Sequence, residues 1–339
     1  MLTHANRPLA TALMLPLVAL LFVSTPPARA ATSVTDLSPV WSMRMNFQQA
    51  HQSPVGQAIV DELRRIKPNY DELWSGLVDT IGLDPRTDLG RVRVLAEGLD
   101  ERDAIVLAEL GDTTGKLEGW MLTLPGYDSQ PLDDDTLLHT FLIDDNPAHQ
   151  HAPHETETGP DGESKHRIHV ALPQAPDGRY RIVASHHQGT TRRLAQAMIR
   201  GDGDLLGEPL AEHEILAARI HEMPLDHPKL DANQPGSAVL RSITAASMSL
   251  TADADAIGFS AEMQTTNPPR ARQIAQLLEG LRAMALLGAA GNGPDPFVAD
   301  LLDRVAVEHA QGTAALSVSV SMPQDRFEAW LRRMASEWK

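Results

Sequence analysis

Pairs of short apolar runs, each followed by a segment of helical periodicity, recur four times along the chain. The first pair covers residues 92–96 and 104–108, and apolar residues then fall at i, i+3, i+4 and i+7 from Leu117. This spacing places them on one face of a helix, whereas short apolar runs between polar turns predict strands. Each unit is therefore predicted as a β-hairpin followed by a helix that packs on it.

The three later units repeat this order. The second unit has predicted strands at 168–172 and 179–183 and a helix from 190. The third has strands at 247–252 and 257–263 and a helix from 267. The fourth has strands at 305–309 and 315–320 and a helix around 327–334. A sheet needs three or more strands for independent stability, so two adjacent hairpins are expected to share one sheet. The predicted fold is α+β, with four repeated β-hairpin-plus-helix units forming two antiparallel sheets backed by helices.

The remaining segments divide the chain into a leader and two halves. A strand is predicted at 40–47, helices at 56–65 and 71–81, and a partly helical connection at 202–235 with Leu216, Ile220 and Met223 at helical spacing. The predicted divisions are a signal peptide at 1–30, an N-terminal half at 31–232 with the helical pair, two units and a His-rich loop, and a C-terminal half at 233–339 with two units.

The first thirty residues have the pattern of a signal peptide. A basic region ends at Arg7, an apolar stretch covers residues 9–23, and Ala28-Arg29-Ala30 offers a cleavage site after Ala30. The stretch is shorter than the roughly 20 apolar residues that span a bilayer, and no later segment reaches that length without charges. We expect an exported protein, periplasmic or extracellular, without a membrane span after cleavage.

Composition excludes several classes of function. The chain has no Cys, which excludes disulfides and thiolate chemistry, and its 42% apolar residues suit a globular protein. Its 45 acidic residues outnumber 29 basic ones, for a net charge of -16, and aromatic residues make up 4%. Nucleic-acid binding depends on phosphate-neutralising cations and stacking aromatics, so nucleic acid is not an expected partner.

Histidine is concentrated in one stretch, because eight of the 14 residues lie between 139 and 187. Within it, His149, His151, His154 and Glu155 offer three imidazoles and a carboxylate in seven residues, a set that suits Zn, Cu or Ni. The alternative is that residues 146–165 form a solvated loop whose histidines bind nothing.

Two His-Glu pairs, at 213–214 and 221–222, resemble the start of a zinc-protease helix. That motif needs a second His four positions later, and Ala217 and Leu225 stand there. The pattern excludes a metalloprotease of that kind, and it predicts that His213 and His221 lie on the solvated side of a helix.

A turn that precedes the first hairpin carries a family resemblance. Gly82, Asp84, Pro85, Arg86 and Asp88 lead into the strand at Val92, and Glu279-Gly280-Leu281 lies in the helix around 276–287. With these motifs, residues 40–337 resemble a group of exported, uncharacterised bacterial proteins of planctomycetes and some proteobacteria. The resemblance implies the repeated fold and export, and it implies no reaction. The segment 146–166 is longer and richer in His than this group leads us to expect.

Three hypotheses about function follow from these patterns. The first is a non-enzymatic envelope protein that binds or scaffolds an unidentified protein or small ligand, since no convergent catalytic set is evident. The second is a periplasmic metal-binding protein that uses the His-rich loop. The third is a carrier of an apolar ligand held between sheet and helices. Enzymatic activity is left open, as is the oligomeric state.

Overall fold

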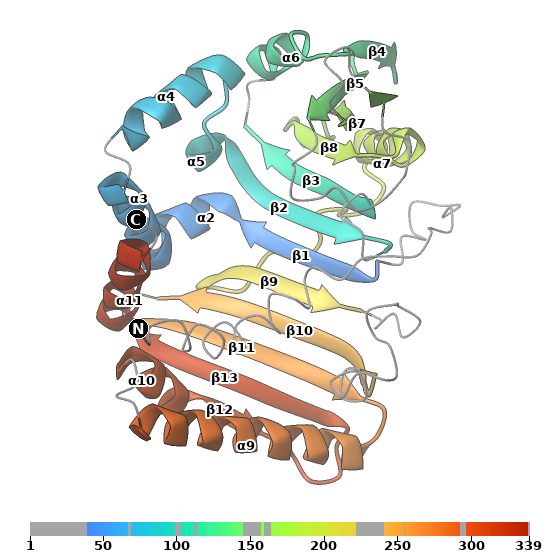
Figure 1. Ribbon diagram of the computed structural model, residues 1–339. Coiled ribbons are helices and arrows are strands. Elements are labelled where there is room, and N and C mark those ends of the chain that lie inside the picture. Colours follow the sequence, from blue (N-terminus) through green and yellow to red (C-terminus); the bar gives the residue numbers. More distant parts are fainter. Residues whose placement is uncertain are drawn as a thin grey trace.

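The computed structural model describes residues 39–66, 69–98, 103–111, 114–144, 157–158, 164–221, 241–253, 255–291 and 296–337 (Figure 1). The predicted signal peptide, the candidate metal ligands His149, His151, His154 and Glu155, and the predicted boundary at residues 232 and 233 lie outside these ranges.

The strands are β1 (Trp41–Asn46), β2 (Leu89–Ala96), β3 (Ala104–Leu110), β4 (Asp128–Pro131), β5 (Leu137–Asp144), β6 (Glu157–Thr158), β7 (Ser164–Ala171), β8 (Arg181–Ser185), β9 (Glu214–Ile220), β10 (Ile243–Ala252), β11 (Ala256–Thr265), β12 (Ala306–Glu308) and β13 (Ala315–Pro323). The helices are α2 (Phe47–Gln52), α3 (Pro54–Ile66), α4 (Tyr70–Ile81), α5 (Pro85–Asp88), α6 (Gly115–Met121), α7 (Gln188–Arg200), α9 (Pro268–Gly291), α10 (Pro296–Arg304) and α11 (Gln324–Glu337).

One antiparallel sheet runs through the molecule. Its strand order is β12-β13-β11-β10-β9-β1-β2-β3-β8-β7-β5-β4, and β6 pairs with β7 off this path (Figure 1). The α+β class is confirmed, but the prediction of two sheets is wrong. The two halves merge because β9 pairs with β1 on one side and with β10 on the other, with Ala218 opposite both Met43 and Met248.

The joining strand β9 lies where a helical connection was predicted, and a β-bulge explains the error. In the pairing with β10, Leu250 lies opposite Leu216 while Thr251 lies opposite Glu214, so Ile215 is an extra residue. The buried positions in β9 are Ile215, Ala218 and Ile220, whose spacing departs from strict strand alternation. That spacing, with Leu216 and Ile220 four apart, gives a pattern typical of a helix.

The two faces of the sheet have different coverings, as strand alternation requires. One face carries Trp41 and Leu316, which pack in a cluster with Ala271 and Ile274 of α9. Helix α6 covers the same face further along, through a cluster that contains Leu117 of α6 with Leu110, Phe141 and Val170 of the sheet. We call this side the helical face; α2, α3 and α11 also contribute to it through a cluster of Val55, Ile215 and Ala252 with Ala50 and Phe327.

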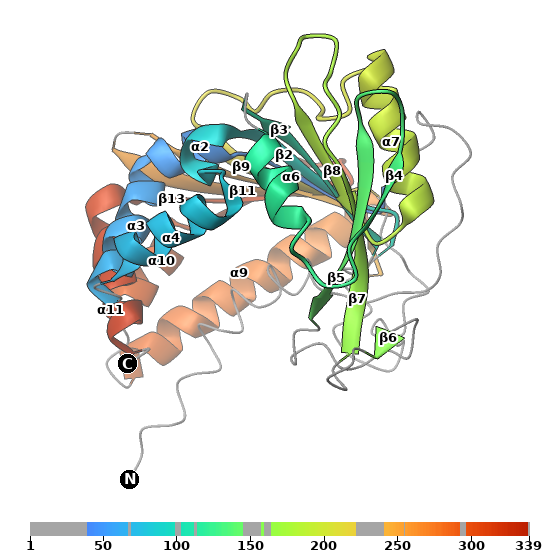
Figure 2. The same ribbon diagram turned by 90° about the horizontal axis from the view of Figure 1, so that it is seen from above.

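The opposite face is covered by α7 over β3, β8 and β7. Leu95 and Leu107 project to this side, where they pack with Leu194, Ala195 and Met198 of the helix. Figure 2 separates α7 and α9 on the two sides of the sheet. The four predicted units are therefore not equivalent, because the second places its helix on the other face; the repeat interpretation is not confirmed.

Over β10, β11 and β13 the same opposite face carries small hydroxyl side chains. Its residues are Ser247, Ser249, Thr251, Ser260, Ser317, Ser319 and Ser321, with Gly258 and Glu262 between them. Ser260, Ser319 and Ser321 are exposed, so this side is open to solvent in the described part of the chain. We call it the serine face.

The turn that carries the family resemblance is a helix end followed by a one-turn helix. Gly82 ends α4 in the left-handed conformation, with φ 75°, and it allows the close approach of Lys116 that any Cβ would block. The Asp84 carboxylate then caps α5 by accepting a hydrogen bond from the Arg86 amide. Capping and turn formation thus account for both residues.

Among the residues that the structure describes, no helix is both long and apolar enough to span a bilayer.

Candidate functional site

A cavity of about 510 Å³ lies on the serine-face side of the sheet, where β2, β1 and β9 meet β10 and β11. Its lining includes Arg44, Arg93, Arg219, His221 and Ser42, together with three acidic residues, Glu208, Glu214 and Glu262. We call it the arginine cavity. Its volume is in the range of small-molecule binding sites.

Strand alternation places the three arginines on one face. In β1 the sequence Trp41-Ser-Met-Arg-Met sends Trp41 to the helical face and Arg44 to the other side. Arg93 of β2 lies directly opposite Arg44, and Arg219 of β9 lies opposite Ser42. Three neighbouring strands therefore bring three guanidinium groups to one cavity.

The loop after α7 forms one wall of the cavity. Arg44 Nη1 donates to the Glu208 carbonyl at 2.7 Å, and Arg93 Nη1 donates to the Leu205 carbonyl at 2.8 Å. Gly207 permits the tight path of this loop, because its φ of 76° is left-handed and it approaches the Arg93 guanidinium. The arginines are thus oriented by neutral carbonyl groups.

None of the three arginines forms an ion pair with an acidic residue in the described ranges. Burial, followed by the nearby charge of Arg44, lowers the pKa of Arg93 below its usual range. Its Nε atom is buried without a hydrogen-bond partner, and an unsatisfied buried donor costs about 1–3 kcal/mol. Like charges directly opposite each other on paired strands are also destabilising. An anion in the cavity would relieve the repulsion between the Arg44 and Arg93 guanidinium groups.

Arg91, two residues before Arg93, is satisfied by acids. It donates to Glu109 Oε1 at 2.9 Å and to Asp204 Oδ2 at 3.1 Å. These bonds raise the pKa of Arg91, with Glu109 as the main cause. The comparison separates a structural arginine from the three of the cavity, which keep donors available for a ligand.

His221 stands beside these cations. Its Nε2 lies 2.8 Å from Ser42 Oγ, and burial, then Arg219 and Arg93, lowers the pKa of its imidazole below 6.5. A Ser–His pair is one part of a hydrolytic triad, whose third member is an acid on the other ring nitrogen. In the described residues no carboxylate contacts His221, so the pair gives the enzyme hypothesis only part of the required set.

The described histidines of the 139–187 stretch lie on both faces of the sheet, and only His169 is close enough to His186 and His187 for their charges to lower its pKa. Thr140 lies opposite His169 in the pairing of β5 with β7, so His139 and His169 project to opposite faces. Both are buried: His139 Nδ1 contacts the Tyr127 hydroxyl at 3.0 Å, and His169 Nδ1 contacts the Thr140 hydroxyl at 2.9 Å. The described residues contain no group of three His, Asp or Glu side chains placed to hold a metal.

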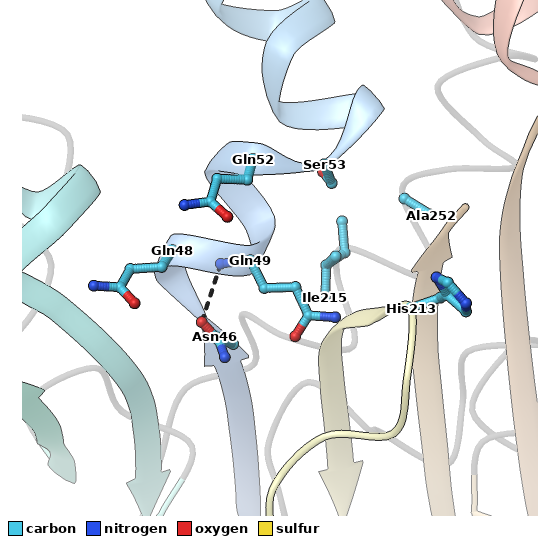
Figure 3. A pocket seen from close by; sticks show the side chains of 8 residues that line it. All are labelled: Asn46, Gln48, Gln49, Gln52, Ser53, His213, Ile215 and Ala252. Atoms are coloured by element: carbon cyan, nitrogen blue, oxygen red, sulfur yellow. Dashed lines mark hydrogen bonds between the residues drawn. The ribbon is translucent and has the colours of Figure 1, made fainter. Parts of the chain in front are cut away.

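A second, shallower cavity of about 340 Å³ lies beside α2 (Figure 3). Four of its residues carry amide side chains: Asn46, Gln48, Gln49 and Gln52. Figure 3 shows Gln49 extending toward Ile215 while Gln48 and Gln52 point to the other side. The Asn46 side-chain oxygen accepts a hydrogen bond from the backbone N–H of Gln49 and so caps α2. Its polar groups diverge and are partly used in capping, so we favour the arginine cavity.

Sequence reasoning missed the cavity because it assigned residues 202–235 to a partly helical connection. His221 was predicted on a solvated helix face and instead lies at the end of a strand. A signal was present: Arg44, Arg91, Arg93 and Arg219 each occupy a polar position in a short apolar segment. Which strands are neighbours cannot be read from that signal.

Comparison with known proteins leaves the family open. The sequence matches no model of a known protein family and no curated protein. Among solved structures, crystal form III of TP0453 has a TM-score of 0.41 and 12% identity, over 91% of this chain and 99% of that chain. Crystal form I of TP0453 has a TM-score of 0.39 and 11% identity, over 91% of this chain and 98% of that chain. At these values the function has to be inferred from the residues themselves.

Proposed function

We propose that this chain is an exported, non-enzymatic binding protein of the cell envelope whose arginine cavity takes an anionic ligand. The observation that carries the proposal is the pairing of Arg44 with Arg93, beside Arg219, without an acidic partner for any of them among the described residues. Export rests on the signal-peptide pattern of residues 1–30.

The net charge of the chain indicates that anions would bind at a specific site and not through general electrostatic attraction. The whole chain carries a net charge of -16, so its average field repels anions. A cluster of cations that neighbouring acids leave unpaired is a local exception. Charge-assisted hydrogen bonds from guanidinium groups to carboxylates or phosphates are among the stronger polar contacts in proteins. The guanidinium end of the cavity therefore suits an anionic group, although Glu208, Glu214 and Glu262 also belong to the lining.

Titration calorimetry with inorganic phosphate, at constant ionic strength and pH 7.5, tests this proposal. We expect saturable binding by the purified protein. Arg219→Gln should weaken it about ten- to a hundredfold, because a hydrogen bond to a charged group contributes about 1.5–3 kcal/mol. Arg219 is exposed and makes no hydrogen bond or ion pair in the described residues, so its replacement leaves the fold intact.

Arg272→Gln is the matched control, since Arg272 is an exposed arginine of α9, the helix that covers the helical face. It should leave phosphate binding unchanged. The proposal is wrong if the purified protein gives no saturable heat with phosphate, or if both substitutions weaken binding equally.

The His-rich segment remains a proposed metal site. The ends of the segment are held together, because Asp144 of β5 lies opposite Lys165 of β7. We expect Zn²⁺, Cu²⁺ or Ni²⁺ to raise the melting temperature of the purified protein, because a ligand of the folded state stabilises it. Replacing His149, His151 and His154 by Ala should abolish this shift. An unchanged shift in the triple variant, or none in the original protein, would exclude the site.

The hypothesis of an apolar carrier gains no support from the two cavities described above. Their side chains are mostly amides, hydroxyls, imidazoles, guanidinium groups and carboxylates, with few apolar groups between them.

A further inference from the structure

The arginine cavity extends beyond its cations onto the serine face. Its lining continues through Ser247, Ser249, Ser260 and Glu262 on β10 and β11. An inorganic ion bound at the arginines would fill only one end of a cavity of about 510 Å³. The remaining space is bounded by groups of a different chemistry, which constrain the rest of the ligand.

The strand register arranges these groups in two rows across the sheet. In the first row Arg93 lies opposite Arg44, Arg44 opposite Ala217, Ala217 opposite Ser249, and Ser249 opposite Ser260. Adjacent strands are about 4.8 Å apart, so the three steps from Arg44 to Ser260 cover roughly 14 Å. Ala217 is the smallest member of this row and leaves the path between cations and hydroxyls unobstructed.

The second row also has a guanidinium group on the β1–β9 side and a hydroxyl on the β10–β11 side. Ser42 lies opposite Arg219, Arg219 opposite Ser247, and Ser247 opposite Glu262. The three guanidinium groups thus stand at the β1–β2–β9 end, where Glu208 and Glu214 also line the cavity and Glu214 accepts a hydrogen bond from the Ala211 amide. Hydroxyls with the Glu262 carboxylate stand at the β10–β11 end. A ligand that matches both rows has an anionic group at one end and hydroxyl groups along the rest of its length.

The groups at the far end are suited to hydroxyls in particular. Serine hydroxyls both donate and accept hydrogen bonds, and a carboxylate accepts only. Ser249 and Ser260 bond each other through Oγ atoms 2.8 Å apart, which leaves further sites on both oxygens for a ligand. The Glu262 carboxylate is exposed and makes no hydrogen bond within the described residues, so it remains available to accept from hydroxyl donors.

The lining also argues against other anions of similar size. The described residues of the cavity include no Phe, Tyr or Trp, so a nucleotide base or aromatic acid has no stacking platform there. By strand alternation Met248 and Ala218 point to the helical face and leave Ala217 as the apolar side chain of the rows. A fatty acid would gain little apolar contact along this path.

We infer that the ligand of the arginine cavity is a polyhydroxylated anion, a sugar acid or a sugar phosphate. The anionic group binds Arg44, Arg93 and Arg219, and the hydroxyl groups bind the serines and Glu262. This inference rests on the proposed function and adds the chemical class of the ligand.

Calorimetry with three small probes tests the inference: glucuronate, acetate and glucose. We expect glucuronate to bind about tenfold or more tightly than acetate, because its hydroxyls add hydrogen bonds, and glucose to bind too weakly to measure. Glucose 6-phosphate against inorganic phosphate repeats the comparison for a phosphoryl group. Whichever pair shows the larger gain identifies the sugar acid or the sugar phosphate.

Two variants test whether the higher affinity for glucuronate than for acetate comes from the serines of β10 and β11. The double substitution Ser249→Ala with Ser260→Ala should reduce glucuronate affinity to that of acetate and leave acetate affinity unchanged. Ser321→Ala, on the same face but outside the described lining, is the control and should change neither.

The outcomes separate the two claims. Equal affinities for glucuronate and acetate, and for the phosphate pair, would overturn the inference while the anion site stands. A gain that survives the double substitution would also overturn it. Binding of none of the anionic probes would remove the proposed function as well.

Discussion

Acidification from pH 6.5 to pH 4 is expected to lower the free energy of unfolding by about 3 kcal/mol through His169 alone. Burial, then the charges of Arg167, His186 and His187, lowers the pKa of His169 to about 4 from its usual 6.5. In the unfolded chain the imidazole of residue 169 is protonated around pH 6.5, whereas in the folded protein it is protonated only around pH 4. The unfolded state therefore gains stability as the pH falls, at about 1.4 kcal/mol per unit of pKa difference.

His169→Asn removes the titration while retaining a polar atom for the contact with Thr140. Urea unfolding at pH 7.0 and pH 4.5 should show a smaller acid-induced loss in this variant than in the original protein. The comparison stops at pH 4.5 because Asp84 and Glu109, whose pKa values Arg86 and Arg91 respectively help to lower, lose stabilisation at more acidic pH. An identical acid-induced loss in both proteins would contradict the assignment.

His187 provides a control of opposite sign. The Asp103 carboxylate beside it raises the pKa of its imidazole above 6.5, with an ion-pair distance of 3.7 Å between His187 Nε2 and Asp103 Oδ1. The folded protein holds this proton more tightly than the unfolded chain, so the contribution is present at low pH and is lost as the pH rises through the folded pKa. His187→Asn should therefore make the acid-induced loss larger.

Leu194→Ala is expected to destabilise the protein by about 2–5 kcal/mol, the range for deleting a buried leucine side chain. Leu194 is fully buried at 0% exposure and packs in the cluster that joins α7 to β2, β3 and β8. Among the described helices α7 alone covers this face, so no neighbouring helix is placed to fill the cavity that the substitution leaves. The residual cavity should keep the cost in the upper part of the range.

Leu287→Ala in α9 is the matched control, since this leucine is 73% exposed. Its effect should stay within about 0.5 kcal/mol, as for most surface substitutions. Urea unfolding followed by circular dichroism measures both variants. Similar midpoints for the two would show that the cluster beneath α7 does not limit stability.

The local pattern of apolar and polar residues predicted many of the individual helices and strands. It could not predict which distant strands pair with each other. Strands β2, β3, β10 and β11 were predicted from apolar runs beside polar turns, and α9 from its periodicity after Asn267. Periodicity reports which way side chains project along one segment. It contains no information on the partner strand, so the junction of β1 with β9 and the merging of two sheets into one could not be derived.

The candidate site depends on that missing information. Arg44, Arg93 and Arg219 lie on three segments that are far apart in the sequence. Within its own segment, each one is an ordinary polar position that indicates no binding site. Strands β4 and β5 were also missed. For β4, the edge strand, the reason is that Asp128–Pro131 is exposed throughout and lacks an apolar pattern. The histidine stretch was conspicuous in composition, yet where the structure describes it His139 and His169 are buried on opposite faces.

The position of β9 has a consequence for how the chain acquires its structure. β1 is among the first strands to be synthesised, yet the partner on one of its sides begins only at Glu214. Contacts between such distant segments form slowly, because the loop between them must be closed first. Until then Trp41–Met45 presents a row of unpaired backbone groups that another chain can extend. A fragment that stops before Glu214 would thus be prone to aggregate from the middle of the sheet, not from its rim.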